Sequence, residues 1–583
     1  MVMLKNQLIR EYYRIEDQSD VRKYLNENEL REVDNGAMYL VGIVQAADTL
    51  NENGRIYPRP ILLREVVNYG KIVAESRALG ELDHPNCFID TAQILSKDGW
   101  KDLKDAEIGE SVYTLNTNTG DIELQEVFAK TDQAYEGKMI RFKSRNIDTL
   151  VTPNHRFYLI DRYGRGSFAT ARQIIDNRKK YNHSYIPKLG SWEGNRDEFF
   201  TIDAIPEDYY KKSAKNIREK NGFDKPLKIK TDIFVKFFGM WVAEGCLKGK
   251  GHVIISQNEG DNADMIREML SEMNTKEFIE RKKVNEFGNI SINFEIHDAR
   301  LNRFLKPLGK VHQKYIPDSL KNLAPNYLKT LFDWFLMGDG RTRISDGYIA
   351  KEVFSISKKL INDLHEIAIK FGRSGNIHVR EPYDHFIGER LIRKENMKLL
   401  YFLHLSTTKG IYLDERHVEI TEEDYNGNVY CVSVPNSTFY ARDNGKAFWT
   451  GNSRSEISLN HVSHMITEIW WDKVNPNLVK AKIKVLSTPS GQILRSLVND
   501  GVKVGISSRA LGSVQETSRG LIVEDNLSII CFDMVSTPST PNAFMLREAI
   551  ERDLMVGGKM VYTKGDRINR ILNELKGYGA IVL

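Results

Sequence analysis

The sequence pattern changes twice along the chain, near residue 87 and near residue 453. Residues 36–84 combine a strand-like apolar run (AMYLVGIV), a polar turn and a helix-like run (ILLREVVNYGKIV), which is typical of mixed α and β structure. From Cys87 to about residue 160, short strand-like runs alternate with Gly, Asn and Asp turns, which predicts an all-β module. After residue 453 the mixed pattern resumes. We therefore interpret the middle of the chain as an insert within a host protein.

Length, charge and cysteine content narrow the class of protein. A chain of 583 residues exceeds what one hydrophobic core holds, so several domains are expected. The 83 basic and 79 acidic residues nearly balance, so any nucleic-acid-binding face must be a local patch. The four cysteines form no CxxC pair, which disfavours a disulfide framework and fits a reducing compartment. We find no signal peptide and no run that could span a membrane, so no membrane partner is expected.

Several segments predict particular elements. TDIFVKFFGMWVAEG (231–245) and LKTLFDWFLMGDG (328–340) predict helices. STPSGQILRSLVNDG (487–501) predicts a capped helix, with Pro489 in its first turn and Gly501 at its end. VKVGISSRA (502–510) predicts a strand that runs into a turn. His461 and His464 are three residues apart, and we favour one packed helix face over a metal pair there.

The edges of the insert resemble those of an intein. Four features carry the resemblance: Cys87, the segment TPNHRF (152–157), the segment VYCVSV (429–434), and Asn452 followed by Ser453. The resemblance implies an insert over 87–452, which is 366 residues long. It implies a horseshoe-shaped all-β splicing (Hint) domain formed by residues 87–200 and 400–452.

The residue types at these edges suit protein splicing. In this family a thiol such as Cys87 attacks the preceding peptide carbonyl, because a thiolate is a strong nucleophile. The resemblance implies that Thr152 and His155 polarise that bond and protonate the leaving amine. Ser453 would then accept the acyl group, and cyclisation of Asn452 would release the insert. Proximity supplies the rate, so no cofactor is expected.

The insert departs from the family pattern at three positions. Gly451 stands where the family often has histidine, and Thr438 stands nearest the place of another histidine. Cys431, which we count among the catalytic candidates, stands where aspartate is commoner. We therefore expect asparagine cyclisation to be slow or to use other groups.

A second resemblance lies inside the insert. FFGMWVAEG (237–245) and LFDWFLMGDG (331–340) are similar to the paired motifs of LAGLIDADG homing endonucleases. The resemblance implies an α+β domain over 225–398 whose substrate is double-stranded DNA at an intein-free copy of the host gene. It implies that Glu244 and Asp339 bind Mg²⁺ for phosphodiester hydrolysis and that Lys314 stabilises charge near the scissile phosphate. Basic and aromatic residues within 248–250 and 376–394 are expected to contact the DNA backbone.

The host segments, 1–86 and 453–583, resemble the prohead core (capsid maturation) proteases of tailed phages. The resemblance rests on NENGRIYP (51–58), GELDHPN (80–86), VGISSRALG (504–512) and CFDMVSTPSTPNAF (531–544). It implies an α+β fold with an assemblin-like β-barrel core surrounded by helices and a Ser–His centre that needs no cofactor. His84 would act as the base.

The serine and the third member of that centre are less firmly placed. We prefer Ser507 as nucleophile because the family serine stands two residues after the glycine, and Ser508 is the alternative. Asp533 is our candidate third member, by its place after the serine. Backbone N–H groups near Arg509 and Ala510 would form the oxyanion hole.

The host resemblance also implies partners and a location. Scaffold and major capsid proteins would be the substrates, and the protease would form an oligomer in the prohead core. It would occur in the infected bacterial cytoplasm and inside the prohead. The alternative is a non-catalytic scaffold or core protein whose splicing-defective insert acts mainly as a DNA endonuclease.

Overall fold

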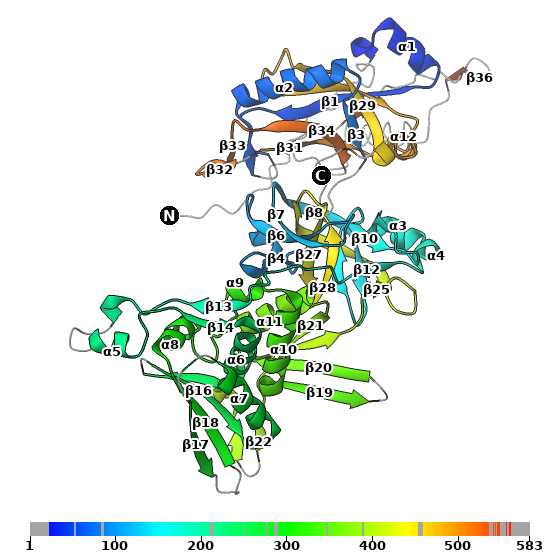
Figure 1. Ribbon diagram of the computed structural model, residues 1–583. Coiled ribbons are helices and arrows are strands. Elements are labelled where there is room, and N and C mark those ends of the chain that lie inside the picture. The colour runs from blue at the N-terminus through cyan, green and yellow to red at the C-terminus, as the bar shows by residue number, and fades with distance from the viewer. Residues whose placement is uncertain are drawn as a thin grey trace, which may run out of the picture. The chain divides into compact units, whose positions relative to one another are not determined.

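The computed structural model divides the chain into two compact units. One comprises Met1–His84 with Glu456–Leu583, and the other comprises Pro85–Ser455 (Figure 1). The structure describes residues 22–51, 54–82, 87–209, 215–249, 251–273, 275, 278–284, 290–345, 348–387, 390–452, 457, 459–512, 514–535, 540, 543, 545–547, 555–556 and 559–560. Among these residues, no helix has the length and apolar character needed to cross a membrane.

The first unit is built on a five-stranded antiparallel sheet in the order β3-β29-β30-β1-β35. Two smaller groups, β31-β34 and β2-β33-β32, accompany it. The strands are β1 (Met38–Ala46), β2 (Arg55–Ile56), β3 (Leu79–Glu81), β29 (Val462–Trp471), β30 (Leu478–Val485), β31 (Gly505–Leu511), β32 (Val514–Thr517), β33 (Gly520–Val523), β34 (Ser528–Val535), β35 (Met545–Arg547), β36 (Met555–Val556) and β37 (Lys559–Met560). The helices are η2 (Arg22–Tyr24), α1 (Glu27–Asp34), α2 (Arg59–Ala74), η8 (Leu459–His461) and α12 (Pro489–Asn499). The unit is therefore mixed α and β, and the expected barrel stays a prediction.

Helix α12 begins and ends where its sequence predicts. The Thr488 hydroxyl accepts a hydrogen bond from the Gly491 N–H, and Pro489 occupies the first turn. Beyond the helix, Gly501 adopts a φ of +81°, a left-handed conformation that glycine tolerates best. Strand β31 differs from expectation, because it begins at Gly505 and continues through Ser507 and Ser508 without a turn.

The prediction of a helix over residues 461–466 is wrong. His461 closes the short helix η8, and strand β29 follows it directly. Buried Val462 and Ile466 contribute to the sheet, and His464 pairs with Gly80 of β3. The pattern VSHMITEIWW is rich in β-branched and aromatic residues, which favour a strand and outweigh the spacing of the two histidines.

The second unit begins and ends with an all-β part. Its strands are β4 (Gln93–Ser96), β5 (Gly99–Asp102), β6 (Ser111–Leu115), β7 (Ile122–Glu126), β8 (Ala129–Lys143), β9 (Asp148–Val151), β10 (Arg156–Ile160), β11 (Gly166–Thr170), β12 (Tyr185–Pro187), β25 (Gly410–Tyr412), β26 (Glu419–Ser433), β27 (Thr438–Asp443) and β28 (Lys446–Gly451). Short helices η3 (Leu103–Asp105), α3 (Ala171–Asp176) and α4 (Arg178–Tyr181) accompany them. Long strands β8 and β26 pair over their whole length, so segments far apart in sequence share one ladder. The horseshoe shape expected here stays a prediction.

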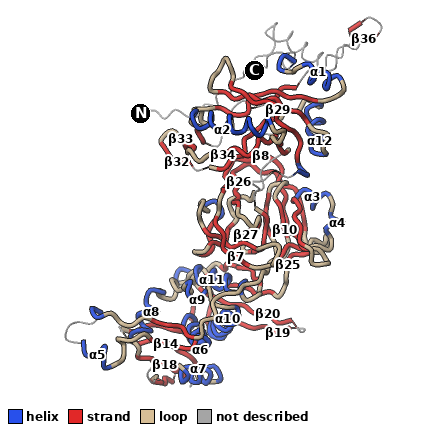
Figure 2. The backbone as a smooth tube through the Cα atoms, turned by 45° about the horizontal axis from the view of Figure 1, so that its top comes forward, coloured by secondary structure: helices blue, strands red, loops and turns tan. Residues whose placement is uncertain are grey.

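The remainder of the second unit contains most of its helices (Figure 2). Its elements are β13 (Phe199–Ile202), η4 (Glu207–Tyr209), α5 (Lys215–Lys220), β14 (Leu227–Lys230), α6 (Thr231–Glu244), β15 (Gly245–Lys248), β16 (His252–Asn258), α7 (Asp261–Glu272), β17 (Ile279–Val284), β18 (Ile290–His297), α8 (Ala299–Leu305), η6 (Lys306–Leu308), α9 (Asp318–Lys321), α10 (Pro325–Asp339), β19 (Gly340–Ser345), β20 (Tyr348–Ser355), α11 (Lys358–Lys370), β21 (Ser374–Arg380), β22 (His385–Ile387), β23 (Arg390–Ile392), η7 (Lys394–Asn396) and β24 (Leu400–Ser406).

This part contains two copies of one motif. Helix α6 is followed by β15, β16, α7, β17 and β18, whose strands lie in the order β15-β16-β18-β17. Helix α10 is followed by β19, β20, α11, β21 and β24, whose strands lie in the equivalent order β19-β20-β24-β21. The second half has the hairpin β22-β23 and the short helix η7 in addition, between β21 and β24. The two predicted helices, α6 and α10, therefore begin equivalent halves.

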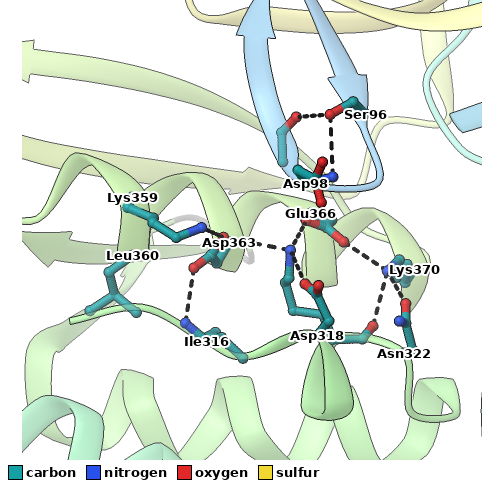
Figure 3. Close-up of polar contacts among 12 residues, drawn as sticks. Ser96, Asp98, Ile316, Asp318, Asn322, Lys359, Leu360, Asp363, Glu366 and Lys370 are labelled. Carbon is teal, nitrogen blue, oxygen red and sulfur yellow. Dashed lines mark hydrogen bonds and ion pairs between the residues drawn. The ribbon is translucent and has the colours of Figure 1, made fainter. Parts of the chain in front are cut away.

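Helix α11 joins this repeat to the all-β part through a buried ionic network (Figure 3). Glu366 accepts hydrogen bonds from Tyr113 of β6 (3.0 Å), Lys370 (2.8 Å) and Lys321 (2.9 Å). Burial alone would raise the pKa of Glu366, but Lys370 and Lys321 hold it below its usual range. A buried carboxylate shared by two ammonium groups fixes one geometry, so α11 is held against β6.

Candidate functional sites

The turn at residues 152–156 contacts both ends of the insert. At the first end, Thr152 Oγ1 accepts a hydrogen bond from the Cys87 N–H (2.9 Å), and the Thr152 N–H donates to the Cys87 carbonyl (3.0 Å). At the other end, the Arg156 guanidinium donates to the Asn452 carbonyl oxygen (3.1 Å) and to its side-chain oxygen (3.2 Å). The structure thus brings together residues that are 365 positions apart.

The side chains around Cys87 are buried. The Cys87 side chain is fully enclosed, and this burial raises the pKa of its thiol well above the ordinary value, with Cys431 adding to the effect. The His155 ring lies 4.4 Å from that of Phe88, and its Nε2 lies 2.7 Å from Thr450 Oγ1. A buried thiol and an adjacent buried imidazole can exchange protons only with groups inside the site.

Asn452 is held at each of its polar groups. Its Nδ2 donates to the Val434 carbonyl (2.8 Å) and its N–H donates to the Ser437 carbonyl (3.0 Å). A Cβ atom at Gly451 would lie 2.5 Å from the Arg156 carbonyl oxygen, so no larger residue fits there without movement. The Thr438 hydroxyl bonds the Leu115 backbone (2.7 and 3.0 Å). Gly451 and Thr438 stand at or nearest to positions where the family often has histidine. Their contacts explain why glycine and threonine fit at these positions.

Arg156 is the functional candidate that the sequence analysis missed. Its only signal in the sequence is its place directly after His155 in TPNHRF. The contact with Asn452 joins residues 296 positions apart, which no local pattern reveals. Ser453 lies outside the described residues.

Glu244 and Asp339 end the two equivalent helices, α6 and α10. The helices touch closely, because a Cβ at Gly239 would lie 2.4 Å from the Leu331 carbonyl oxygen. Burial and then the neighbouring Glu244 raise the pKa of Asp339 to about 6, and burial also raises the pKa of Glu244. Two half-buried carboxylates that repel each other are a suitable oxygen-ligand pair for a hard cation.

Lys314 lies beside these carboxylates but is bound elsewhere. Its ammonium donates to the carbonyls of Trp241 (3.1 Å), Val242 (2.9 Å) and Gly245 (2.8 Å), at the C-terminal end of α6. Burial lowers the pKa of Lys314 to about 8, while Asp339 opposes the shift. The structure therefore shows Lys314 capping a helix, and its contact with phosphate stays a prediction.

In the first unit, Ser507 lies directly opposite Asp533 in the β31-β34 pair. Ser508 lies on the other face of the strand, where its hydroxyl accepts a hydrogen bond from Gln45 Nε2 (2.8 Å). The ladder shifts register between Arg509, which pairs with Cys531, and Ala510, which pairs with Ile529. Ile530 of β34 is therefore the extra residue of a bulge. His84 lies outside the described residues.

The carboxylate of Asp533 forms a buried ion pair with Arg509. Arg509 donates to both of its oxygens (2.8 and 2.9 Å), and the Glu81 N–H donates to Oδ1 (3.0 Å). Arg509 also donates to the Glu81 carboxylate (2.8 Å). This geometry positions β31 against β3 and β34, and a triad role for Asp533 stays a prediction.

His464 is buried beside this network and serves the fold. Its Nδ1 lies 2.8 Å from Ser463 Oγ and its Nε2 lies 3.0 Å from the Phe532 carbonyl oxygen. Burial lowers the pKa of His464 to about 4, so the ring is neutral at physiological pH. Both nitrogens have partners, which leaves no ligand position for the metal pair considered from the sequence.

Comparison with protein families gives one match, in the C-terminal part of the chain. Residues 444–553 match the family described as prohead core protein serine protease, a range that includes Ser507 and Asp533. Among solved structures, the bacteriophage T4 capsid assembly protease is 24% identical over 14% of this chain and 50% of its own, with a TM-score of 0.13. A split intein variant (AceL NrdHF) covers 64% and 100% at 10% identity (TM-score 0.21), and the homing endonuclease I-WcaI covers 34% and 84% at 13% identity (TM-score 0.23).

Three curated relatives match a larger share of the chain. They are an ATP-dependent Clp protease proteolytic subunit of Chlamydomonas moewusii (21% identical, 76% of this chain), a DNA-directed RNA polymerase subunit beta C-terminal section of Stigeoclonium helveticum (24%, 64%) and a ribonucleoside-diphosphate reductase subunit beta of Aquifex aeolicus (21%, 72%). The chain spans 53%, 36% and 56% of their lengths, respectively.

Proposed function

We propose that the chain is the precursor of a phage prohead maturation serine protease, interrupted by a self-splicing intein that carries a homing endonuclease. The observation that carries the proposal is the 152–156 turn, which binds Cys87 through Thr152 and Asn452 through Arg156. Splicing needs both scissile bonds in one site, because proximity must replace an external catalyst.

The curated relatives support an insert that occurs in unrelated hosts. Their printed names denote a peptidase subunit, an RNA polymerase subunit and a reductase subunit, which share no reaction. Each match covers at least 64% of this chain, whereas the host segments amount to 217 of its 583 residues. Each match must therefore include much of the insert.

The first splicing step would use the thiol of Cys87. The sulfur bonds to the preceding carbonyl carbon, the peptide C–N bond breaks, and the freed amine gains a proton from His155. Thr152 Oγ1 already accepts from the N–H of that bond, which orients the leaving nitrogen. The thiol is neutral because burial raises its pKa. Its proton leaves as the sulfur attacks and replaces the proton that His155 gives to the amine, so the step has no net proton change.

The later steps would use Ser453 and Asn452. The Ser453 hydroxyl takes the acyl group from Cys87, and Asn452 Nδ2 then attacks its own carbonyl carbon and breaks the bond to Ser453. The negative charge that develops on the Asn452 carbonyl oxygen lies where Arg156 donates. An O-to-N shift then joins Asn86 to Ser453 by an ordinary peptide bond.

The endonuclease part would hydrolyse double-stranded DNA with Mg²⁺ held by Glu244 and Asp339. Half-buried carboxylates at two helix ends fit this hard cation, which would stabilise charge at the scissile phosphate. The sheets that follow the two helices carry exposed basic side chains that suit phosphate contacts: Lys248, Arg281, Lys283, Arg341, Arg343 and Arg380.

The host protease would use Ser507 as nucleophile, His84 as base and backbone N–H groups near Arg509 and Ala510 as oxyanion hole. The match of residues 444–553 supports capsid maturation, with scaffold and capsid proteins as substrates. Residues 1–86 and 453–583 would form the protease, and 87–452 the intein. An oligomer within the prohead core remains part of the proposal.

Intact-mass spectrometry of the freshly expressed chain tests the proposal. Splicing conserves atoms, so the 67.0 kDa chain should yield products of about 42 and about 25 kDa, by their shares of 366 and 217 residues. The smaller product should contain an Asn86–Ser453 peptide bond. A matched variant with Cys87→Ala and Asn452→Ala should stay at full length. A wild-type chain that also persists uncut would contradict the splicing proposal.

Proteolysis is tested separately on the smaller product. Ser507→Ala should abolish cleavage of scaffold protein, and Ser508→Ala should retain it. The opposite pattern would assign the nucleophile to Ser508, and retained cleavage in both would contradict a serine mechanism at this strand.

A further inference from the structure

Two histidines and a glutamate gather on one face of the sheet that follows α6. Alternate residues of β16 and β18, among them Val253, Phe294 and Ile296, are buried in the core. The residues between them, including His252, Glu295 and His297, therefore point to the opposite face. His252 and His297 are direct cross-strand partners, and Glu295 precedes His297 by two positions on the same face.

The three side chains converge at one point. One potential ligand atom from each of them lies within 4.8 Å of the other two, and the two imidazole rings are 4.1 Å apart between centroids. His297 Nε2 makes no hydrogen bond within the described residues, and it lies 3.8 Å from Glu295 Oε2. That separation is too long for a hydrogen bond, so the imidazole nitrogen and the carboxylate oxygen can both turn to a shared ion.

The ligand set indicates the class of ion. Two imidazoles and one carboxylate suit divalent first-row transition metals such as Zn²⁺, whereas Mg²⁺ and Ca²⁺ prefer oxygen ligands. Asn302 donates to the His252 carbonyl (2.9 Å), which fixes the backbone of one ligand. The cluster therefore differs in chemistry from the Glu244–Asp339 pair.

One group competes for the site. Arg281 Nε donates to Glu295 Oε2 (2.9 Å), the oxygen that an ion at this site would need. Its side chain is 61% exposed, compared with 7% for Glu295, so the guanidinium can leave the carboxylate at little cost. Lys248 also faces Glu295 and weakly opposes a cation.

We propose that His252, Glu295 and His297 form a binding site for a divalent transition-metal ion of the Zn²⁺ class. The ion would link β16 to β18 and add positive charge to the sheet face that bears Lys248 and Arg281. This inference stands on the cluster itself and does not depend on splicing or on DNA cleavage.

Zinc titration by calorimetry tests the site in the full chain. The parent carries Cys87→Ala and Asn452→Ala to prevent splicing, and Cys246→Ser to remove an exposed thiol that would bind zinc. We expect one equivalent of Zn²⁺ to bind the parent. His252→Ala and His297→Ala should each weaken that binding about tenfold or more, and His312→Ala, at an exposed histidine elsewhere, should leave it unchanged.

Arg281→Ala provides a test in which zinc binding should become tighter, not weaker. Removal of the competing guanidinium should tighten zinc binding, provided that thermal unfolding shows a folded protein. Equal zinc affinity in the parent, both histidine variants and Arg281→Ala would mean adventitious binding only and would overturn the proposal.

Discussion

At the scale of single residues, Arg156 provides the guanidinium that donates to the Asn452 carbonyl oxygen. Gly451 cannot provide such a group, because its Cβ position lies 2.5 Å from the Arg156 carbonyl oxygen. The close approach of residues 451 and 156 thus excludes a side chain at position 451. It also places the Arg156 side chain on Asn452.

Replacement of Arg156 by Ala should slow cleavage after Asn452 by about 100-fold, the usual loss when one oxyanion donor is removed. The rate is measured by mass spectrometry in a Cys87→Ala precursor, where only this cleavage occurs. Thiol-induced cleavage before Cys87, measured in an Asn452→Ala precursor, should change little. Exposed Arg162→Ala is the control. An unchanged rate after Asn452 would remove Arg156 from the mechanism.

The raised pKa of Asp339 predicts that its ionised carboxylate lowers the stability of the fold while the proposed DNA cleavage requires it. Its folded pKa is about 6, above the usual value near 4, so ionisation destabilises the fold at pH values above 6. Asp339→Asn should therefore raise the free energy of unfolding at pH 7 by on the order of 1 kcal/mol while abolishing DNA cleavage. The gain should vanish near pH 4, where the wild-type carboxyl is protonated. A destabilised variant at pH 7 would contradict this assignment.

The same pKa should set the pH dependence of the proposed endonuclease. Ionised carboxylates would bind the cation, so DNA cleavage should decline as the pH falls through about 6. Initial cleavage rates between pH 5 and 8 test this, with excess Mg²⁺ as a control because added cation should partly restore the rate at low pH.

At the scale of elements, the contact between α6 and α10 depends on small residues. A side chain at Gly239 would meet the Leu331 carbonyl oxygen at 2.4 Å and the Phe335 nitrogen at 3.1 Å. Gly239→Val should therefore force the helices apart, lower the free energy of unfolding by about 1–3 kcal/mol and abolish DNA cleavage. Gly251→Val, at a glycine with open space, should have a small effect on stability. Denaturant unfolding that is equal in both variants would contradict the argument.

The elements also show what the sequence could predict. Helices α6 and α10 follow from long apolar segments that end before a glycine, and α12 follows from clear signals at both ends. The structure confirms all three helices. The spacing of two histidines predicts a helix where strand β29 forms. The composition of that segment, rich in β-branched and aromatic residues, is the better signal there. Local patterns determine such elements only where one signal dominates.

The sites divide in the same way. Motifs in the sequence predict Cys87, Thr152 and Asn452 as site residues. The structure places Thr152 on Cys87 and adds Arg156 as a contact of Asn452. The Arg509–Asp533–Glu81 network could not be predicted, because it joins three strands whose pairing no local pattern reveals. Long-range hydrogen bonds were therefore the part of the site that required a structure.

At the scale of the whole molecule, the proposed insert would interrupt the host three residues after the proposed base, His84. A precursor blocked by Cys87→Ala and Asn452→Ala should cleave scaffold protein about 100-fold more slowly than the joined product, because displaced catalytic groups lose their alignment. Purified precursor and product are compared at equal concentration. A precursor that cleaves at the product's rate would show that the insert leaves the protease site intact.

The pairing of β3 with β29 has a consequence for the speed of folding. Glu81 and Val462 are partners in that ladder, and 380 residues separate them in the precursor. Removal of residues 87–452 would leave 14 residues between them, so the same pairing would become local in sequence. Pairings between distant residues form slowly, and local ones form fast. A host chain made without its insert should thus refold faster than the precursor, even though the same strands meet in both.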